Sequence, residues 1–193
     1  MIGALLAGGR GRRMGGGKPA RELAGRPLVA WPAEALAGAC SRVVVVAKPA
    51  TELPPLDGVE RWDEPDGDHH PARGIAYALE RAGEPVLVCA ADMPFVTAAA
   101  CRAVAAGLGE GAGGAPSPAA AVTVAGGVLQ PVFAAYSPAA LDALRGAAPD
   151  ASLTSTVRGL GPVLVELEPG LVRSVDTAED LAGAEAELGL RGA

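Results

Sequence analysis

The sequence has few aromatic side chains and few cysteines. Only 3% of its 193 residues are Phe, Trp or Tyr, although half of them are hydrophobic, so the interior must be built mainly from Ala, Val and Leu. Small side chains must pack closely, which favours helices laid on a Val-rich sheet. The three cysteines, Cys40, Cys89 and Cys101, lack Cys-x-x-Cys spacing. We expect them to be reduced core residues of a cytoplasmic protein.

Long apolar runs are also absent. No stretch of about 20 apolar residues exists that could span a membrane. The N-terminus has no charged region ahead of an apolar stretch, and Arg10 interrupts the first apolar run early. We therefore expect no signal peptide and no membrane partner. A length of 193 residues suits one domain over residues 1–193, with enough chain for a substantial core.

Positive charge is scarce except at one place. The net charge of −6 argues against a general nucleic-acid binder. The first 26 residues nevertheless carry six Lys or Arg side chains and a single acid, Glu22. A basic segment on an acidic body predicts a small anionic ligand bound at one place.

That basic segment is also rich in glycine. Between an apolar run at 2–7 and a second one that begins at Pro27, residues 8–18 contain six glycines and four cations. Glycine lets backbone N–H groups approach a ligand and adopts the positive φ values of an anion-binding loop. Arg and Lys in such a loop bind polyanions, of which phosphate is the usual one. The segment 1–28 is therefore predicted to bind phosphate.

Two common phosphate motifs do not fit this loop. A Walker A motif ending at Lys18 needs glycine at position 12 and Ser or Thr at position 19, where the chain has Arg12 and Pro19. The dinucleotide fingerprint counted from Gly9 needs a sixth-place glycine, where the chain has Met14. The loop must bind phosphate in another way.

The rest of the chain alternates strand and helix patterns. Alternation of this kind predicts an α/β fold with a mostly parallel sheet covered by helices on both faces. Ligands bind such sheets at the carboxyl ends of the strands. We expect a mobile surface loop at 107–118, which is rich in Gly and Pro. The expected strands are 2–7, 42–47, 59–62, 85–90, 119–125, 128–136, 162–167 and 171–175, and the expected helices are 27–39, 72–82, 97–107, 138–146, 152–159 and 177–189.

Two aspartates follow predicted strands and precede predicted helices. Asp92 comes after the apolar strand at 85–90, where a carboxylate either holds Mg²⁺ at the sheet edge or stabilises a turn. The topology should bring it to the same edge as the loop at 1–28. Asp176 follows the predicted strand at 171–175 and is interpreted as part of a helix cap, because Thr177 and Asp180 follow in capping-box spacing.

Acids and histidines gather in a third place, at Asp66, Asp68, His69 and His70. Adjacent histidines beside acids suggest transition-metal binding. The sequence has no further His and no cysteine pair to complete a zinc site. Solvated loop residues are the favoured interpretation.

The glycine-rich segment resembles a known family. Leu-Ala-Gly-Gly at 6–9, Arg-Met-Gly at 13–15, Lys18 and Gly-Arg-Pro-Leu at 25–28 are similar to the signature of the MobA-like nucleotidyltransferases, which include the molybdenum cofactor guanylyltransferases. Asp-Met-Pro-Phe at 92–95 resembles the family's metal-binding motif. The resemblance extends from residue 2 to about residue 185, and its motifs are dense in 4–28 and 89–96.

The resemblance implies a three-layer α/β/α fold with a Rossmann-like sheet and a small antiparallel extension. It implies transfer of GMP from GTP to the phosphate of molybdopterin, with Mg²⁺ as cofactor and pyrophosphate as product. Proteins of molybdoenzyme maturation are the further partners that it implies. The strand at 130–136 would line the acceptor side. The resemblance assigns Arg13 and Lys18 to the triphosphate, and Asp92 to Mg²⁺ with Asp176 as a second ligand. It assigns the base and phosphates to Leu6, Ala7, Gly8 and Gly9. It also assigns the base to Asp68, with Asp66 as the next candidate, beside Gly74.

The chain departs from the family pattern at two places. Residues 70–74 match it only at Pro71 and Gly74, and Asp176 stands where the family usually has asparagine. Gly9 favours guanine over cytosine, because cytidylyltransferase relatives typically have Leu-Ala-Ala-Gly where this chain has Leu-Ala-Gly-Gly. The alternatives are a cytidylyltransferase, an enzyme acting on another phosphorylated acceptor such as phospholactate or a sugar phosphate, and a nucleotide-binding protein without turnover.

Overall fold

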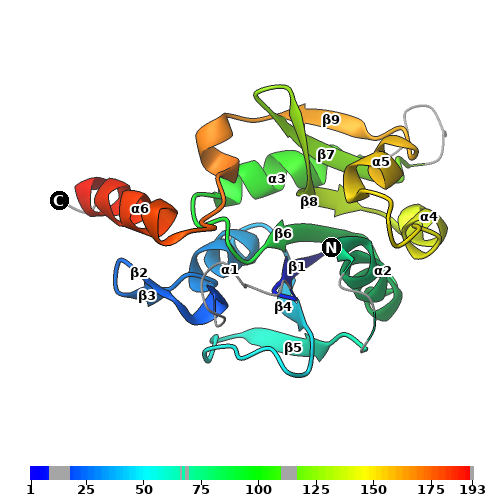
Figure 1. Cartoon of the computed structure of the whole chain (residues 1–193). Coiled ribbons are helices and arrows are strands. Elements are labelled where there is room, and N and C mark those ends of the chain that lie inside the picture. Colours follow the sequence, from blue (N-terminus) through cyan, green and yellow to red (C-terminus); the bar gives the residue numbers. More distant parts are fainter. Residues whose placement is uncertain (9–17, 66, 68–69, 110–116, 192–193) are drawn as a thin grey trace.

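A computed structural model describes residues 1–8, 18–65, 67, 70–109 and 117–191. In this part of the chain seven strands form one sheet in the order β5-β4-β1-β6-β8-β7-β9 (Figure 1). Only β8 runs antiparallel to the others, so the predicted α/β class with a mostly parallel sheet is confirmed. The strands are β1 (Ile2–Leu6), β4 (Arg42–Ala47), β5 (Val59–Asp63), β6 (Val86–Ala90), β7 (Ala120–Ala125), β8 (Val128–Tyr136) and β9 (Val163–Glu166).

Strand β1, which lies between β4 and β6, aligns the edge of the sheet at which these parallel strands end. Leu6 is paired with Val46 of β4 on one side and with Ala90 of β6 on the other. Backbone hydrogen bonds from Ala7 N to Val46 O (2.9 Å) and from Ala91 N to Leu6 O (3.1 Å) continue this pairing past the strand ends. The residues that follow β1, β4 and β6 therefore lie next to one another at one edge, as expected for a parallel sheet.

Helices cover both faces of the sheet, which gives the expected three layers (Figure 1). Helices α1 (Ala30–Ala37) and α3 (Ala98–Ala106) pack on one face, against Leu5, Val45 and Phe133. Helices α2 (Pro71–Ala82), α4 (Leu141–Arg145) and α5 (Leu153–Arg158) pack on the other. Both interfaces consist largely of Ala, Val and Leu, as the composition indicates. Close packing of these small side chains supplies the dispersion contacts that few aromatics are present to make.

The antiparallel part of the sheet is the β7–β8 hairpin. Residues 134–136 of β8 pair with both β6 and β7, whereas Phe133 pairs with β6 alone and residues 128–130 pair with β7 alone. The register shifts by a bulge at Val122 and Thr123, opposite the segment that contains Pro131. A buried hydrogen bond from Tyr136 Oη to Pro131 O (2.7 Å) holds this segment, and burial raises the pKa of Tyr136 above its usual range. The end of the hairpin at which β7 is joined to β8 thus extends past the part of β8 that pairs with β6.

A second, two-stranded sheet lies beside helix α1. Strands β2 (Glu22–Leu23) and β3 (Arg26–Pro27) pair antiparallel, and α6 (Ala178–Arg191) packs on them through a small cluster that includes Leu23, Phe95 and Val175. Helix α6 begins with a capping box. Thr177 Oγ1 accepts a hydrogen bond from Asp180 N (3.1 Å), and Asp180 Oδ2 accepts one from Thr177 N (2.8 Å). Hydrogen bonds from Thr177 and from the backbone of Asp176 lower the pKa of the Asp180 carboxyl.

One predicted element starts later than expected, and another is wrong. The helix predicted at 27–39 begins only at Ala30, because Arg26–Pro27 pairs with Glu22–Leu23 instead of opening the helix. The strand predicted at 171–175 is a 3₁₀ turn over Pro169–Val172 followed by irregular chain. Both segments have apolar patterns typical of regular elements, but Arg26–Pro27 pairs locally with Glu22–Leu23, and Leu171 and Val172 pack against the core from a turn.

The predicted surface loop at 107–118 and the three cysteines can also be compared with the structure. Residues 110–116 of the predicted mobile loop lie outside the described residues. Cys89 and Cys101 are buried free thiols and Cys40 is partly buried, as expected for core cysteines. Burial raises the pKa of Cys40 to about 11 and that of Cys101 to about 12, so neither thiol is ionised near neutral pH. No helix in the described ranges is long and apolar enough to cross a membrane.

We predict that Thr177→Ala loosens the start of α6. The substitution removes the hydroxyl that caps Asp180 N, and losing an N-cap of this kind costs about 1 kcal/mol of unfolding free energy. Urea unfolding measures this cost. Thr156→Ala is the matched control, because Thr156 lies inside α5 and its hydroxyl makes only a long contact of 3.4 Å to Ser152 O. Equal losses in the two variants would contradict the capping role.

Candidate active site

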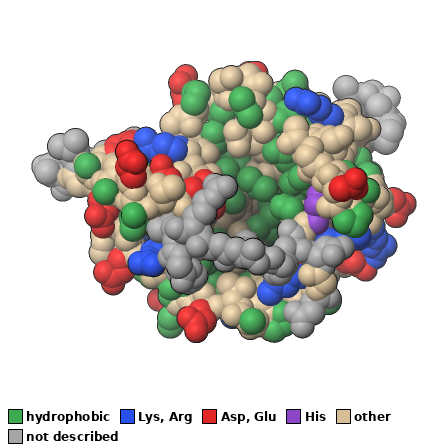
Figure 2. All heavy atoms as spheres, in the orientation of Figure 1, with side chains coloured by type: hydrophobic (Ala, Val, Ile, Leu, Met, Phe, Trp, Pro, Cys, Tyr) green, Lys and Arg blue, Asp and Glu red, His purple; other side chains and the backbone are tan. Residues whose placement is uncertain are grey.

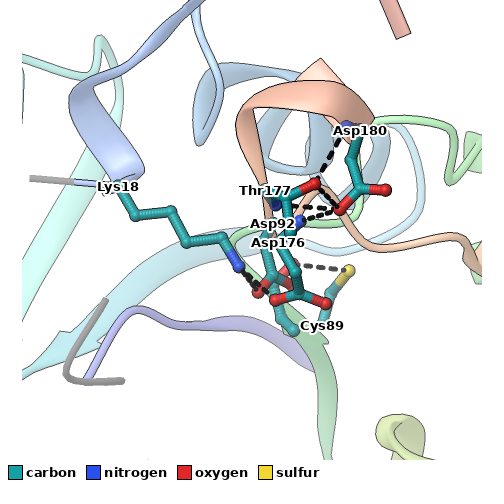
Figure 3. A network of polar contacts seen from close by, with 7 residues as sticks. Lys18, Cys89, Asp92, Asp176, Thr177 and Asp180 are labelled. Carbon is teal, nitrogen blue, oxygen red and sulfur yellow. Dashed lines mark hydrogen bonds and ion pairs between the residues drawn. The ribbon is translucent and has the colours of Figure 1, made fainter. Parts of the chain in front are cut away.

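A lysine and two aspartates meet at the edge where the parallel strands end. Lys18 opens a short 3₁₀ turn, Lys18–Ala20, and its side chain reaches across toward the end of β6. Its ammonium group donates hydrogen bonds to Asp92 Oδ2 (2.6 Å) and to Asp176 Oδ1 (2.7 Å). The three residues come from segments separated by 74 and 158 positions in the chain. Figure 3 shows both carboxylates pointing toward the same nitrogen.

The register of the sheet sets the position of Asp92, and a backbone hydrogen bond to Asp92 sets the position of the chain at Asp176. Asp92 lies two residues beyond the end of β6, in the turn that leads to α3. Its backbone oxygen accepts a hydrogen bond from Val175 N (2.9 Å), so the chain before α6 runs alongside it. Asp176 follows directly and projects its carboxylate beside that of Asp92 (Figure 3). The expected convergence of the basic segment and Asp92 at one edge is confirmed.

The capping interpretation of this segment is confirmed for Thr177 and Asp180, whereas the side chain of Asp176 contacts Lys18. Thr177 and Asp180 satisfy the backbone at the start of α6, and Asp176 contributes only its N–H, which donates to Asp180 Oδ2 (3.0 Å). The carboxylate of Asp176 is therefore left for Lys18. Its side chain remains half exposed, with 53% of its surface accessible, against 27% for Asp92 and 14% for Lys18.

Opposing effects act on the charge of Lys18. Burial, the largest effect, disfavours the ammonium form and by itself would lower the pKa of Lys18. Hydrogen bonds to Asp176 and Asp92, together with their negative charges, outweigh burial and raise the pKa above its ordinary value. Two carboxylates around one ammonium leave a net negative charge, so the cluster can accept additional positive charge.

The arrangement fits a divalent cation of the Mg²⁺ type. Asp92 and Asp176 offer hard oxygen ligands close together, and Mg²⁺ is usually bound by one or two carboxylates with water and phosphate oxygens. Within the residues that the structure describes, no three His, Cys, Asp or Glu side chains gather as a complete metal cage. A closed zinc site of four protein ligands is not formed there.

A second polar pair lies at the same edge, across β1 from Asp92. Lys48 and Glu64 follow directly on β4 and β5, and each is only 7% exposed. Lys48 Nζ lies 3.0 Å from Glu64 Oε1 and donates to Pro65 O (2.7 Å). This pair was missed at the sequence level. Its signal is similar to the one that found Asp92, namely a charged residue just after the end of a strand of the sheet.

Two predicted nucleotide-binding glycines border this pair. A Cβ built on Gly8, or one built on Gly74, would lie 3.6 Å from Glu64 Oε2. Leu6 ends β1 and Ala7 follows it, so the described part of the predicted 6–9 segment is at this edge. Gly9, Arg13, Asp66 and Asp68 lie outside the described residues, and so does His69. On the face seen in Figure 2, hydrophobic side chains line a central hollow, with charged side chains around its borders.

His70 has a structural role instead of a solvated one. Its Nδ1 accepts a hydrogen bond from Ala72 N (3.2 Å) and so caps α2, and its Nε2 lies 2.7 Å from Ala151 O. A ring nitrogen that accepts and another that contacts a carbonyl oxygen define the neutral Nε2–H tautomer. Both nitrogens are occupied, so this histidine is not available as a metal ligand.

Comparisons with known proteins agree with this geometry. The chain is 38% identical over 102 residues to a protein of Mycobacterium tuberculosis named "Probable molybdenum cofactor guanylyltransferase", and the match covers 50% of this chain and 51% of that protein. The chain thus spans about half the length of the curated relatives it matches.

Solved structures share the fold over nearly the whole chain. Molybdopterin-guanine dinucleotide biosynthesis protein A from Archaeoglobus fulgidus is 24% identical with a TM-score of 0.69, and the match covers 98% of this chain and all of that one. A 2-C-methyl-D-erythritol 4-phosphate cytidylyltransferase from Thermus thermophilus is 21% identical with a TM-score of 0.64, covering 96% and 98%. A model of the MobA-like NTP transferase domain matches residues 3–164. The chain therefore belongs to the family of MobA-like NTP transferases.

Proposed function

We propose that this protein is a Mg²⁺-dependent guanylyltransferase that transfers GMP from GTP to the terminal phosphate of molybdopterin. The observation that carries the proposal is the joint contact of Lys18 with Asp92 and Asp176 at the ligand-binding edge of the sheet. Membership of the MobA-like family and the name of the M. tuberculosis relative support it. The fold, the cluster and the family point to the same reaction class.

The reaction needs charge stabilisation and alignment, and it needs no covalent intermediate on the protein. A phosphate oxygen of the acceptor attacks the α-phosphorus of GTP. The new P–O bond forms as the bond from the α-phosphorus to the oxygen that bridges to the β-phosphate breaks, and the electron pair leaves with pyrophosphate. Negative charge spreads over the phosphoryl oxygens, where cations already in position lower the barrier.

The residues at the edge have complementary roles in this scheme. Lys18, and Arg13 by family resemblance, would bind the triphosphate. Asp92 and Asp176 would hold Mg²⁺, which supplies Lewis-acid stabilisation of phosphoryl oxygens when bound. When the substrate binds, the ammonium of Lys18 would exchange its carboxylate partners for phosphate oxygens, because Asp92 and Asp176 would then pair with Mg²⁺.

Cytidylyl transfer is the second candidate. The fold likeness to the cytidylyltransferase of T. thermophilus favours it, and so does the departure of residues 70–74 from the guanylyltransferase pattern. Gly9 favours guanine by resemblance to the family. Measurement of nucleotide preference separates the two.

We predict that the purified protein binds GTP at least tenfold more tightly than CTP, ATP or UTP in the presence of Mg²⁺. Tenfold corresponds to about 1.4 kcal/mol of binding free energy. Titration calorimetry with each nucleotide measures this preference. A preference for CTP would reassign the protein to cytidylyl transfer, and no binding of any nucleotide would refute nucleotidyl transfer.

We predict that Asp92→Ala abolishes turnover but spares much of the nucleotide binding. The carboxylate would hold the metal at the reacting phosphates, and removing one stabilising group of this kind costs about 10²- to 10³-fold in kcat. Release of pyrophosphate measures turnover, and calorimetry measures binding. Asp57→Ala, which removes an exposed acid from a turn, is the control and should retain full activity. Unchanged activity in Asp92→Ala would exclude the metal-binding role.

We predict that Lys18→Met weakens the binding of GTP and of inorganic triphosphate by similar factors, at least tenfold each. The methionine keeps the length of the side chain but removes the charge that would contact phosphate. Because the carboxylates raise the pKa of Lys18, the ammonium stays charged between about pH 6 and 9, and wild-type affinity should not fall in that range through loss of its proton. A selective loss for GTP alone would contradict phosphate contact.

A further inference from the structure

The two outermost strands of the large sheet differ in the side chains that they expose. Strand β5 carries the charged residues Glu60, Arg61 and Asp63, which discourage pairing with another chain. Strand β9, at the opposite border of the sheet, carries Val163 and Leu164, which are 39% and 57% exposed (Figure 1). They are two of the three large hydrophobic side chains that are exposed in the described part of the chain. An outermost strand of this kind is suited to pairing with a further strand.

The backbone of β9 offers hydrogen-bonding groups on its outer side. Leu167 N donates to Val124 O of β7 (2.9 Å), which continues the parallel pairing past the end of β9. Successive residues of a strand point their N–H and C=O groups to opposite sides, so alternate residues, counted back from Leu167, face β7. The N–H and C=O groups of Leu164 and Glu166 therefore face outward. No backbone group of the residues that the structure describes pairs with them there.

One register pairs all these outward groups between two copies of the chain. If two β9 strands run antiparallel with Val165 on the two-fold axis, Leu164 of each copy lies opposite Glu166 of the other. Each of the two pairs then exchanges two hydrogen bonds. Centring on Leu164 would place Pro162, which has no N–H, opposite Glu166. Centring on Glu166 would place two like charges opposite each other, so the register centred on Val165 is the favoured one.

The same register buries the apolar side chains of β9. Val165 points to the face of the sheet that α3 covers, because a Cβ built on Gly107 at the end of α3 would lie 3.0 Å from Val165 Cγ2. Side chains alternate along a strand, so Val163 and Leu167 lie on that face too. Val163 of each copy would then lie opposite Leu167 of the other. Since Val165 and Leu167 already pack against the core on this face, the cores of the two copies would become continuous.

Charges at the two ends of β9 favour the antiparallel arrangement. Arg158 at the end of α5 precedes the strand, whereas Glu166 ends it and Glu168 follows. All three side chains are exposed, and they form no ion pair among the described residues. Glu166 lies on the face that α5 covers, as alternation from Val165 requires. Antiparallel pairing would bring Arg158 of each copy toward the acidic end of the other strand, where unlike charges attract.

We propose that β9 is a dimerisation strand, through which two copies of this chain join their sheets by antiparallel pairing centred on Val165. The partner is a second copy because the strand complements itself in backbone groups, apolar side chains and charge. Strands β8 and β7 separate β9 from β6, so the pairing takes place away from the cluster of Lys18, Asp92 and Asp176. The antiparallel relation turns the candidate active sites of the two copies in opposite directions. Dimerisation of this kind is independent of the reaction that the protein catalyses.

Sedimentation equilibrium at increasing protein concentration tests the proposal. The mass should rise from one chain to two and no further, because a closed two-fold pairing occupies both strands. Leu164→Lys places a charge on the outermost strand at an exposed position, so it should fold as the wild type and raise the dissociation constant of the dimer by about tenfold or more. Val128→Lys is the matched control, because it changes the third exposed hydrophobic side chain, which lies on β8, and it should leave the dimer unchanged.

Inversion of charge tests the antiparallel direction. Arg158→Glu should weaken the dimer, because it brings an acid to the acidic end of the other strand. The triple variant Arg158→Glu, Glu166→Arg, Glu168→Arg makes the two ends unlike again and should recover the dimer. All three positions are exposed, so the melting temperature of the single chain should change little.

Disulfide cross-linking tests the register. Val165→Cys would place two thiols opposite each other at the two-fold axis, with Cβ atoms about 5 Å apart and within reach of a disulfide after small adjustment. Leu164→Cys would place its thiols diagonally, with about 7–8 Å between them, and should cross-link much less. Mild oxidation followed by non-reducing electrophoresis measures the yield. The wild-type chain gives the background, since its own cysteines are buried or partly buried.

Several results would overturn the proposal. A mass of one chain at every concentration would leave β9 to a strand of a different protein or to no partner. Equal weakening by Leu164→Lys and Val128→Lys, or failure of the triple variant to recover the dimer, would place the contact elsewhere. A covalent dimer from Leu164→Cys in the absence of one from Val165→Cys would exclude the register.

Discussion

The contact of one ammonium with two carboxylates organises this protein. Lys18 follows the glycine-rich segment, Asp92 follows the central strand β6, and Asp176 precedes the last helix, yet a single nitrogen lies within 2.7 Å of an oxygen from each aspartate. Without that contact, two partly buried carboxylates would face one another at the edge of the sheet. The interaction therefore joins the start, the middle and the end of the chain at one place.

Several distant elements are needed to make this contact. The register of β1 with β6 sets the position of Asp92, and the hydrogen bond from Val175 N to Asp92 O aligns the chain before α6. The capping box of Thr177 and Asp180 satisfies the backbone there and leaves the carboxylate of Asp176 available. The packing of α6 on the β2–β3 sheet holds this segment against the body of the protein. These hydrogen bonds and packing contacts thus determine where the carboxylate of Asp176 lies.

The two charged clusters along this edge of the sheet differ in how accessible they are. The cluster of Lys18, Asp92 and Asp176 is partly accessible and can exchange its partners, whereas Lys48 and Glu64 are buried and held by backbone. An exchangeable cluster suits phosphates and a metal, which must enter and leave in each cycle. The free end of the β7–β8 hairpin lies beyond β6, on the side away from Glu64.

The sequence alone determined the fold class and most of the strands, because Val-rich runs such as 42–47 and 85–90 have few alternatives to a buried strand. It also determined that Asp92 and the residues that follow β1 share an edge, since carboxyl ends of parallel strands coincide. Only the structure decided the start of α1, where Pro27 joins a strand pair, and the turn at 169–172, because an apolar pattern does not show which residues it pairs or packs with. It also decided that Asp176 faces Lys18 and that Lys48 meets Glu64. Side-chain pairing of this kind depends on how separate strands are aligned in space, which local patterns do not encode.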